Sequence, residues 1–144
     1  MPRKSKAVVL DTWAVIAYFE DEPAGEQVAE VITKAHEYST PIMMTVANAG
    51  EVWYLFARKS PVAEADRSIS ELRQLGIVFV DIGWALARQA ADFKSRYRMS
   101  YADCFAAALA KEKKAELVTG DSEFKQIESE VKIRWVKNLD RRAN

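Results

Sequence analysis

Four acidic side chains occupy places in this sequence from which they could bind a metal ion together: Asp11, Glu51, Asp103 and Asp121. Carboxylate oxygens are the ligands that Mg²⁺ and Mn²⁺ prefer in proteins. A zinc site of nitrogen and sulfur ligands is excluded, because the chain has one cysteine, Cys104, and one histidine, His36. Any metal bound by these residues would therefore be a hard cation held by carboxylates.

Each of the three aspartates also has a purely structural explanation. Asp11 and Asp121 could each cap the helix that follows, and Ser100-Tyr101-Ala102-Asp103 fits a capping box. Taken one at a time, these positions do not require a metal. Taken together, all four acids lie where the chain leaves one edge of the expected sheet, and this shared placement favours one metal site over separate caps.

Glu51 is the acid that is hardest to explain without a cation. Its neighbours at helical spacing include Ala47 and Leu55, and no basic residue lies three or four positions away. A carboxylate on an apolar helix face costs desolvation free energy unless a positive charge meets it. A bound cation would supply that charge.

The acids are carried by a chain in which short apolar runs alternate with helical patterns. The runs that read as strands are 6–10, 42–45, 77–80, 116–119 and 132–136. The stretches that read as helices are 12–20, 24–38, 46–59, 62–75, 84–97, 100–114 and, as a short helix, 123–127. Strands separated by helices predict an α/β fold, with a central, mostly parallel sheet and helices on both of its faces.

This fold would gather the acids at one edge of the sheet. In an open α/β sheet the functional crevice lies beyond the carboxyl ends of the strands. Asp11 directly follows the first strand, Asp121 follows the fourth, and Glu51 and Asp103 lie in the first two turns of helices that leave the same edge. Grouped carboxylates repel one another, and Mg²⁺ or Mn²⁺ would neutralise them.

The bulk composition is that of an ordinary globular protein. At 144 residues, of which 49% are hydrophobic, the chain has the length of one domain, and we expect a single domain over residues 1–144. No apolar run is long enough to cross a bilayer, and the basic N-terminus (1–6) is followed by too short an apolar run for a signal peptide. With its lone cysteine, the chain is expected to be soluble and cytoplasmic.

Charge is balanced over the chain as a whole. Lys and Arg together number 21, as do Asp and Glu, so the net charge is zero. This balance argues mildly against nucleic-acid binding through bulk electrostatics. A local basic stretch nevertheless contains Lys94, Arg96 and Arg98. Charge runs of this kind are most often solvated helix faces.

Four blocks of the sequence resemble the PIN-domain family, in particular the VapC-like toxin ribonucleases of toxin–antitoxin pairs. The blocks are Val8-Val9-Leu10-Asp11-Thr12, Thr45-Val46-Ala47-Asn48-Ala49-Gly50-Glu51-Val52, Met99-Ser100-Tyr101-Ala102-Asp103-Cys104-Phe105-Ala106-Ala107-Ala108-Leu109-Ala110 and Leu117-Val118-Thr119-Gly120-Asp121-Ser122-Glu123-Phe124. They stand in the family's order and span nearly the whole chain. One aspartate after a strand is a weak signal, whereas four blocks in order are a strong one.

The resemblance implies a three-layer α/β/α sandwich and hydrolysis of RNA phosphodiester bonds with Mg²⁺, or Mn²⁺, as the cofactor. By position, the family's metal-binding acids correspond to Asp11, Glu51, Asp103 and Asp121. Thr12 and Thr119 match the hydroxyl residues that support those acids. No acid of the pattern is missing, so nothing in the match suggests an inactive enzyme.

The resemblance also implies partners: an RNA substrate, an antitoxin protein and a second copy of the chain. Contacts to RNA phosphates would come from Lys94, Arg96 and Arg98. Tyr97 and Tyr101 could stack on unpaired bases, whereas Trp13 reads as core packing. Aromatic residues that exceed the needs of a core predict an interface: Tyr18, Phe19, Trp53, Tyr54 and Phe56.

Two other chemistries place an aspartate after the first strand. An aspartyl phosphatase would need a second aspartate two residues on, where this chain has Trp13. A phosphoacceptor receiver would need an aspartate after the third strand, and only Asp81 partly fits. The alternative that stays open is a PIN-type nucleic-acid-binding or regulatory module that keeps the acids without turnover.

Overall fold

The structure is a computed structural model that describes residues 7–138. Its strands are β1 (Val8–Leu10), β2 (Ile42–Thr45), β3 (Ile77–Val80), β4 (Glu116–Thr119) and β5 (Ile133–Trp135). Its helices are α1 (Thr12–Phe19), α2 (Pro23–Glu37), α3 (Val46–Ala57), α4 (Val62–Gln74), α5 (Trp84–Arg96), α6 (Tyr101–Lys113) and the short 3₁₀ helix η1 (Ser122–Ile127). Every expected element is present, with bounds within two residues of the expectation. Lys6, expected to begin the first strand, lies outside the described residues together with the rest of the basic N-terminus.

The five strands form one sheet in the order β3-β2-β1-β4-β5, and every neighbouring pair is parallel. The expected α/β fold is therefore confirmed, with a sheet that is parallel throughout. After β1 the chain moves toward β2, whereas after β4 it moves the other way, toward β5. Connections that leave adjacent strands in opposite directions open a crevice at the carboxyl ends of those strands. That crevice lies beside Asp11 and Asp121.

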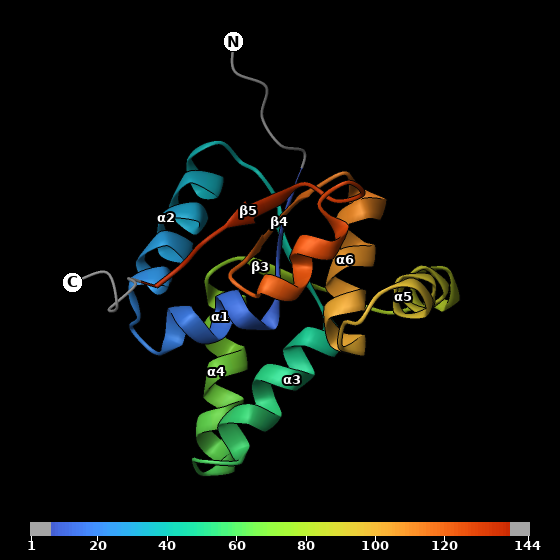
Figure 1. Cartoon of the computed structure of the whole chain (residues 1–144). Helices are drawn as coiled ribbons and strands as arrows, with labels where there is room; N and C mark the ends of the chain where they lie inside the picture. The colour runs from blue at the N-terminus through green and yellow to red at the C-terminus, as the bar shows by residue number, and fades with distance from the viewer. Residues whose placement is uncertain (1–6, 139–144) are drawn as a thin grey trace, which may run out of the picture.

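Helices cover both faces of the sheet and make three layers, as Figure 1 shows for α2 on one side and α6 on the other. Strand residues alternate between two cores: Val9 packs in the core that contains α5 and α6, while Val8 and Leu10 pack in the core that contains α1 and α2. Leu117 and Val118 of β4 divide in the same way. Because both faces are buried, the strands read as continuous apolar runs in the sequence.

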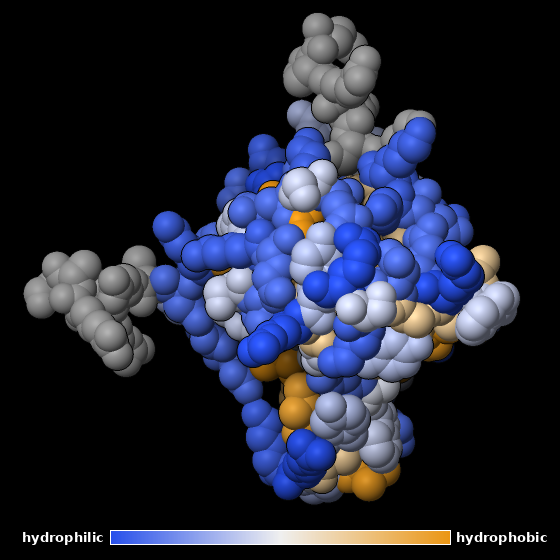
Figure 2. Space-filling model, turned by 45° about the vertical axis from the view of Figure 1, so that its right-hand side comes forward, coloured by the Kyte–Doolittle hydropathy of each residue, from blue (hydrophilic) through white to orange (hydrophobic). Residues whose placement is uncertain are grey.

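Helices α3 and α4 form a hairpin that projects from the body (Figure 1). Figure 2 shows hydrophobic residues gathered in and below a hollow where this hairpin meets the rest of the molecule. The hairpin is anchored at its base by Val52 and Leu72, which are buried in the core on the α1–α2 side of the sheet. Within residues 7–138, no helix combines the length and apolar character needed to span a bilayer.

Candidate metal centre

The four acids predicted from the sequence meet at the carboxyl ends of β1 and β4. Glu51, Asp103 and Asp121 line a single cleft of about 460 Å³. Asp11 is fully buried, with 0% of its surface exposed, and it lies close enough to Glu51 and Asp121 for their charges to affect its titration. Residues separated by more than one hundred positions thus share one environment, as the topology of the sheet requires.

Asp11 is at once a helix cap and a buried acid. Its Oδ1 accepts a hydrogen bond from the Ala14 amide at 2.8 Å, so it caps α1 as the sequence suggested. Its Oδ2 accepts a hydrogen bond from the Thr119 hydroxyl. Burial raises the pKa of Asp11 to about 7, with smaller contributions from Asp121 and Glu51, although its two hydrogen bonds act in the opposite direction. A cap alone would not need this crowding of charge.

Asp103 lies in the first turn of α6, where its own amide donates to the Ser100 hydroxyl at 3.1 Å. This is half of the expected capping box. Within the described chain, no hydrogen bond from the Ser100 amide to the Asp103 carboxylate completes the box, so the carboxylate is left to face the cleft. Burial, together with the charges of Asp11, Asp121 and Glu51, raises the pKa of Asp103 to about 8.

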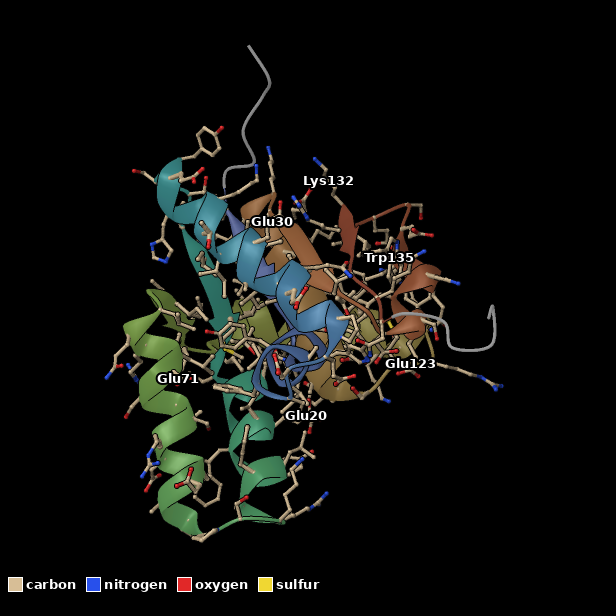
Figure 3. All side chains as sticks on the ribbon, turned by 90° about the vertical axis from the view of Figure 1, so that its left-hand side faces the viewer. Glu20, Glu30, Glu71, Glu123, Lys132 and Trp135 are labelled. Atoms are coloured by element: carbon tan, nitrogen blue, oxygen red, sulfur yellow. The ribbon has the colours of Figure 1, made fainter. Side chains whose placement is uncertain are left out.

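Glu123 is a candidate ligand that the sequence reasoning missed. One carboxylate oxygen from each of Asp103, Asp121 and Glu123 lies within 4.8 Å of the other two. Asp121 caps η1 by accepting from the Glu123 amide at 2.9 Å. Figure 3 shows β5 running from Lys132 toward Trp135, and Glu123 lies farther in that direction, at the carboxyl end of the sheet. The available signal was a second acid two residues after Asp121.

Thr119 joins the two acids that follow β1 and β4. Its hydroxyl donates to Asp11 and accepts from the Asp121 amide at 3.0 Å. The residue is fully buried at the end of β4. The other expected hydroxyl, Thr12, is also buried and donates to the Asn48 carbonyl at 3.4 Å. Thr119 therefore bonds to two of the acids, whereas Thr12 lines the same cleft and bonds to Asn48.

Glu51 is half-buried on α3, and its hydrogen-bond donor is the Tyr54 hydroxyl, at 3.2 Å. The charge of Glu51 raises the pKa of Tyr54. Within residues 7–138, no lysine or arginine forms an ion pair with this carboxylate. Its negative charge is thus offset only by a neutral donor.

The cleft combines an acidic side with an apolar one, and no lysine or arginine of the described chain lines it. Its apolar side includes Trp13, Ile16 and Leu55. Trp13 is half-buried rather than a pure core residue, and its ring covers Gly120 so closely that a Cβ there would lie 2.2 Å from the ring. Only glycine fits between Thr119 and Asp121 while the indole keeps this position.

The predicted RNA-binding residues are not among those that line this cleft. The Lys94 ammonium donates to the Met99 carbonyl at 2.6 Å. Arg96 pairs with Asp92 at 2.8 Å and with Glu130 at 2.7 Å. Arg98 is exposed, and its backbone forms two hydrogen bonds with the Gln126 side chain.

Cys104 is fully buried beside Asp103 on α6. Burial raises the pKa of its thiol to about 11, so it is not poised as a nucleophile. The polar chemistry of the site therefore rests on oxygen ligands.

The donor set fits a small divalent cation. Mg²⁺ holds oxygens at ~2.1 Å, so ligands on opposite sides of one ion lie ~4.2 Å apart. The 4.8 Å grouping of Asp103, Asp121 and Glu123 is close to that span. Burial is the main cause of the raised pKa values of Asp11 and Asp103, and the neighbouring carboxylates add to it; a dication would offset the charge of these buried acids.

Comparison with known proteins agrees with this geometry. A model of the PIN domain family matches residues 8–130. A chain of the VapBC2 complex of Rickettsia felis bound to a promoter DNA fragment has a TM-score of 0.70 at 14% identity, over 91% of this chain and 99% of that chain. A chain of a toxin–antitoxin complex from Klebsiella pneumoniae has a TM-score of 0.67 at 16% identity, over 92% of this chain and 100% of that chain. No curated protein sequence matches the chain.

A third similar structure is VapC20 of Mycobacterium tuberculosis, which is described as a toxin that cleaves the sarcin–ricin loop. It has a TM-score of 0.64 at 17% identity, over 83% of this chain and 94% of that chain. Identities this low show a shared fold and nothing finer.

Proposed function

Because the chain belongs to the PIN domain family, we propose that it is a metal-dependent endoribonuclease that acts as the toxin of a toxin–antitoxin pair. The observation that carries this proposal is the meeting of Asp11, Glu51, Asp103 and Asp121 at one crevice. Four carboxylates brought together from four separate elements, two of them buried, are costly to fold unless a cation binds there.

Mg²⁺ or Mn²⁺ is the proposed cofactor, with Asp103, Asp121 and Glu123 nearest to one another and Asp11 and Glu51 completing the acidic shell. When bound, the ion would activate a water and offset negative charge at the scissile phosphate. The protein's part is to hold the carboxylates in place. Thr119 does so for the first and fourth acids, because its hydroxyl bonds to Asp11 and to the Asp121 amide.

RNA entry to this cleft would depend on the cation. The described lining includes five acidic residues and no basic ones, so a phosphate would meet repulsion in the metal-free protein. At neutral pH, Asp11 and Asp103 hold protons for much of the time, since their pKa values are about 7 and 8. Cation binding would displace those protons and prepare the cleft for an anionic substrate.

The remaining partners follow from the proposed role. An antitoxin protein is proposed because several solved structures of this fold are toxin–antitoxin complexes. A homodimer is proposed because aromatic side chains such as Tyr54 remain exposed on the surface. Among the three basic candidates for RNA contact, Arg98 is the one whose exposed side chain forms neither an ion pair nor a hydrogen bond within residues 7–138; its two hydrogen bonds are made by its backbone. Lys94 and Arg96 are engaged within the protein.

The direct test is cleavage of a labelled structured RNA by the purified protein in Mn²⁺ or Mg²⁺ and in EDTA. We expect cutting only with metal, and a loss of at least about a hundredfold in Asp103→Asn. Asp81→Asn is the matched control, because Asp81 also follows a strand, at the end of β3, but is exposed and does not line the cleft. Its rate should stay at the wild-type value.

Two outcomes would contradict the proposal. Cutting that persists in EDTA and in Asp103→Asn would assign the activity to a contaminant. RNA that binds in the presence of metal but is never cut, over a range of RNA substrates, would support the alternative of a binding or regulatory module.

A further inference from the structure

Asn48 is a fully buried polar side chain that does not line the cleft. It stands in the first turn of α3, one turn before Glu51 on the same helix. Buried amides are retained where each of their hydrogen-bonding groups has a partner. The partners of Asn48 come from three separate parts of the chain.

The oxygen of the Asn48 side chain is engaged within its own helix start. The Thr45 hydroxyl, which caps α3, donates to Asn48 Oδ1 at 2.6 Å and accepts from the backbone N–H of Asn48 at 3.1 Å. This reciprocal pair fixes the side chain at the point where β2 becomes α3. Both hydrogens on Nδ2 are then directed at other elements.

Those two hydrogens reach the elements that carry the other buried acids. Asn48 Nδ2 donates to the Thr12 hydroxyl at 3.2 Å and to the Ala102 carbonyl at 3.2 Å. Thr12 directly follows Asp11, and Ala102 directly precedes Asp103. The orientation of the amide is unambiguous, because a flipped amide would place its oxygen against the Ala102 carbonyl.

We propose that Asn48 is a positioning residue that sets the spacing of Asp11, Glu51 and Asp103 around the metal. This inference rests on the proposed function. An amide suits the task, because it ties the starts of α1, α3 and α6 together without a charge. A lysine or arginine there would compete with the cation, whereas an acid would add to the repulsion already present among the carboxylates.

The test measures Mn²⁺ affinity directly, by electron paramagnetic resonance of free Mn²⁺, at a temperature where each variant is fully folded. Removing the tie in Asn48→Ala should weaken Mn²⁺ binding by about tenfold or more, as for other residues that orient metal ligands. With a short RNA at saturating Mn²⁺, kcat should fall while KM changes little.

Ser68→Ala is the matched control. Ser68 is also buried, and its hydroxyl donates to the Ala65 carbonyl at 2.7 Å, in α4 and outside the cleft. This variant should lower the melting temperature and leave the Mn²⁺ dissociation constant and kcat unchanged. Asn48→Ala with wild-type Mn²⁺ affinity and kcat would overturn the positioning role, even if its melting temperature fell.

A second variant covers the case in which Asn48→Ala does not fold. Thr12→Val keeps the shape of Thr12 but removes the oxygen that accepts from Asn48, so it should also weaken Mn²⁺ binding; unchanged affinity there would overturn the proposal. The failures are distinguishable. Absence of Mn²⁺ binding by the wild-type protein would defeat the proposed function itself, whereas equal binding by wild type and variants would defeat only the role of Asn48.

Discussion

At the scale of single residues, capping and metal binding fall on the same carboxylates. Asp11 caps α1, and Asp121 caps η1, so the structural explanations suggested by the sequence are correct for both. Each cap uses one carboxylate oxygen. Asp121 still lines the cleft, and Asp11 is buried close enough to it for the charge of Asp121 to raise its pKa. Helix starts at the edge of the sheet therefore aim these side chains, and the caps hold them in place.

Asp11→Asn separates the two roles, because asparagine caps a helix nearly as well as aspartate. Removing one charge from a crowded buried group should hold or raise the metal-free melting temperature. The stabilisation by added Mn²⁺ should shrink, because metal bound to the native state adds to stability. RNA cleavage should fall by about a hundredfold or more. Circular dichroism checks the fold, and full activity in a folded variant would refute the catalytic assignment.

The pH dependence of the metal-free protein provides a second test. Asp11 and Asp103 have folded-state pKa values of about 7 and 8, raised from 3.8. Between the ordinary pKa of 3.8 and these raised values, the native state binds more protons than the unfolded state. The free energy of unfolding should therefore decrease as the pH rises from 5 to 8. Thermal unfolding in EDTA measures this slope.

The same slope has internal controls. It should be shallower in Asp11→Asn, and saturating Mn²⁺ should flatten it, since the metal-bound acids, like those of the unfolded chain above pH 5, hold no protons. The pKa of Glu130 is held far below its ordinary range by Arg96 and Tyr97, so its titration lies outside this window. A flat profile for the wild-type protein would mean that these acids are not buried together.

At the scale of the helices, two glycines should respond in opposite ways to alanine. Gly25 lies where α2 crosses α1, and a Cβ there would come within 2.4 Å of the Ala17 carbonyl oxygen. Gly25→Ala should therefore destabilise the fold by about 1–3 kcal/mol. Gly50 on α3 has open space around it, and Gly50→Ala should stabilise by about 0.5–1 kcal/mol. Chemical denaturation measures the change in the free energy of unfolding for each variant. Changes of the same sign in the two variants would mean that the α1–α2 crossing is looser than described.

The two arginines of the basic stretch, Arg96 and Arg98, should respond differently to substitution by alanine. Arg96 joins α5 to the segment after η1 through Glu130, which also pairs with Lys111 of α6. Arg96→Ala should therefore lower the melting temperature. Arg98→Ala should leave stability unchanged but weaken RNA binding, and it should reduce the slope of log K against log salt by about 1. Unchanged affinity and slope in Arg98→Ala would make this side chain a solvated surface group.

At the scale of the whole molecule, the expected interface aromatics lie partly open on α1 and on α3 of the projecting hairpin. Phe19 and Phe56 pack edge to face at 5.3 Å, and both are half-buried, while Tyr54 is 41% exposed. The Trp53 indole donates to Asp66 across the hairpin. Some of this aromatic surface is thus used internally, and the rest is available to a partner.

The homodimer proposed from this surface predicts a particle of twice the chain mass of 16.3 kDa. Light scattering coupled to gel filtration at micromolar concentration measures it. A mass that stays at one chain across the accessible concentration range would count against the dimer. Such a result would leave the metal site unaffected, because every acid of the cleft comes from one chain.

The sequence by itself determined the class of fold, the order of its elements and the positions of four acids. Apolar periodicity and the residues that start and stop helices are local properties, so they can be read from short windows. The placement of Asp11 and Asp121 after strands also predicted their meeting, because parallel strands end at the same edge. The resemblance to the PIN domain family, confirmed over residues 8–130, rested on four sequence blocks that stand in the family's order.

Only the tertiary structure decided which polar groups share an environment. It placed Glu123 beside Asp103, engaged Arg96 with Glu130, and joined Asn48 to both Thr12 and Ala102. These partners lie from 20 to 54 positions apart in the chain, and no local pattern of residue types distinguishes them from other pairs. Hydrogen bonds and charge interactions act over a few ångströms, so they depend on how the helices pack against the sheet rather than on spacing along the chain.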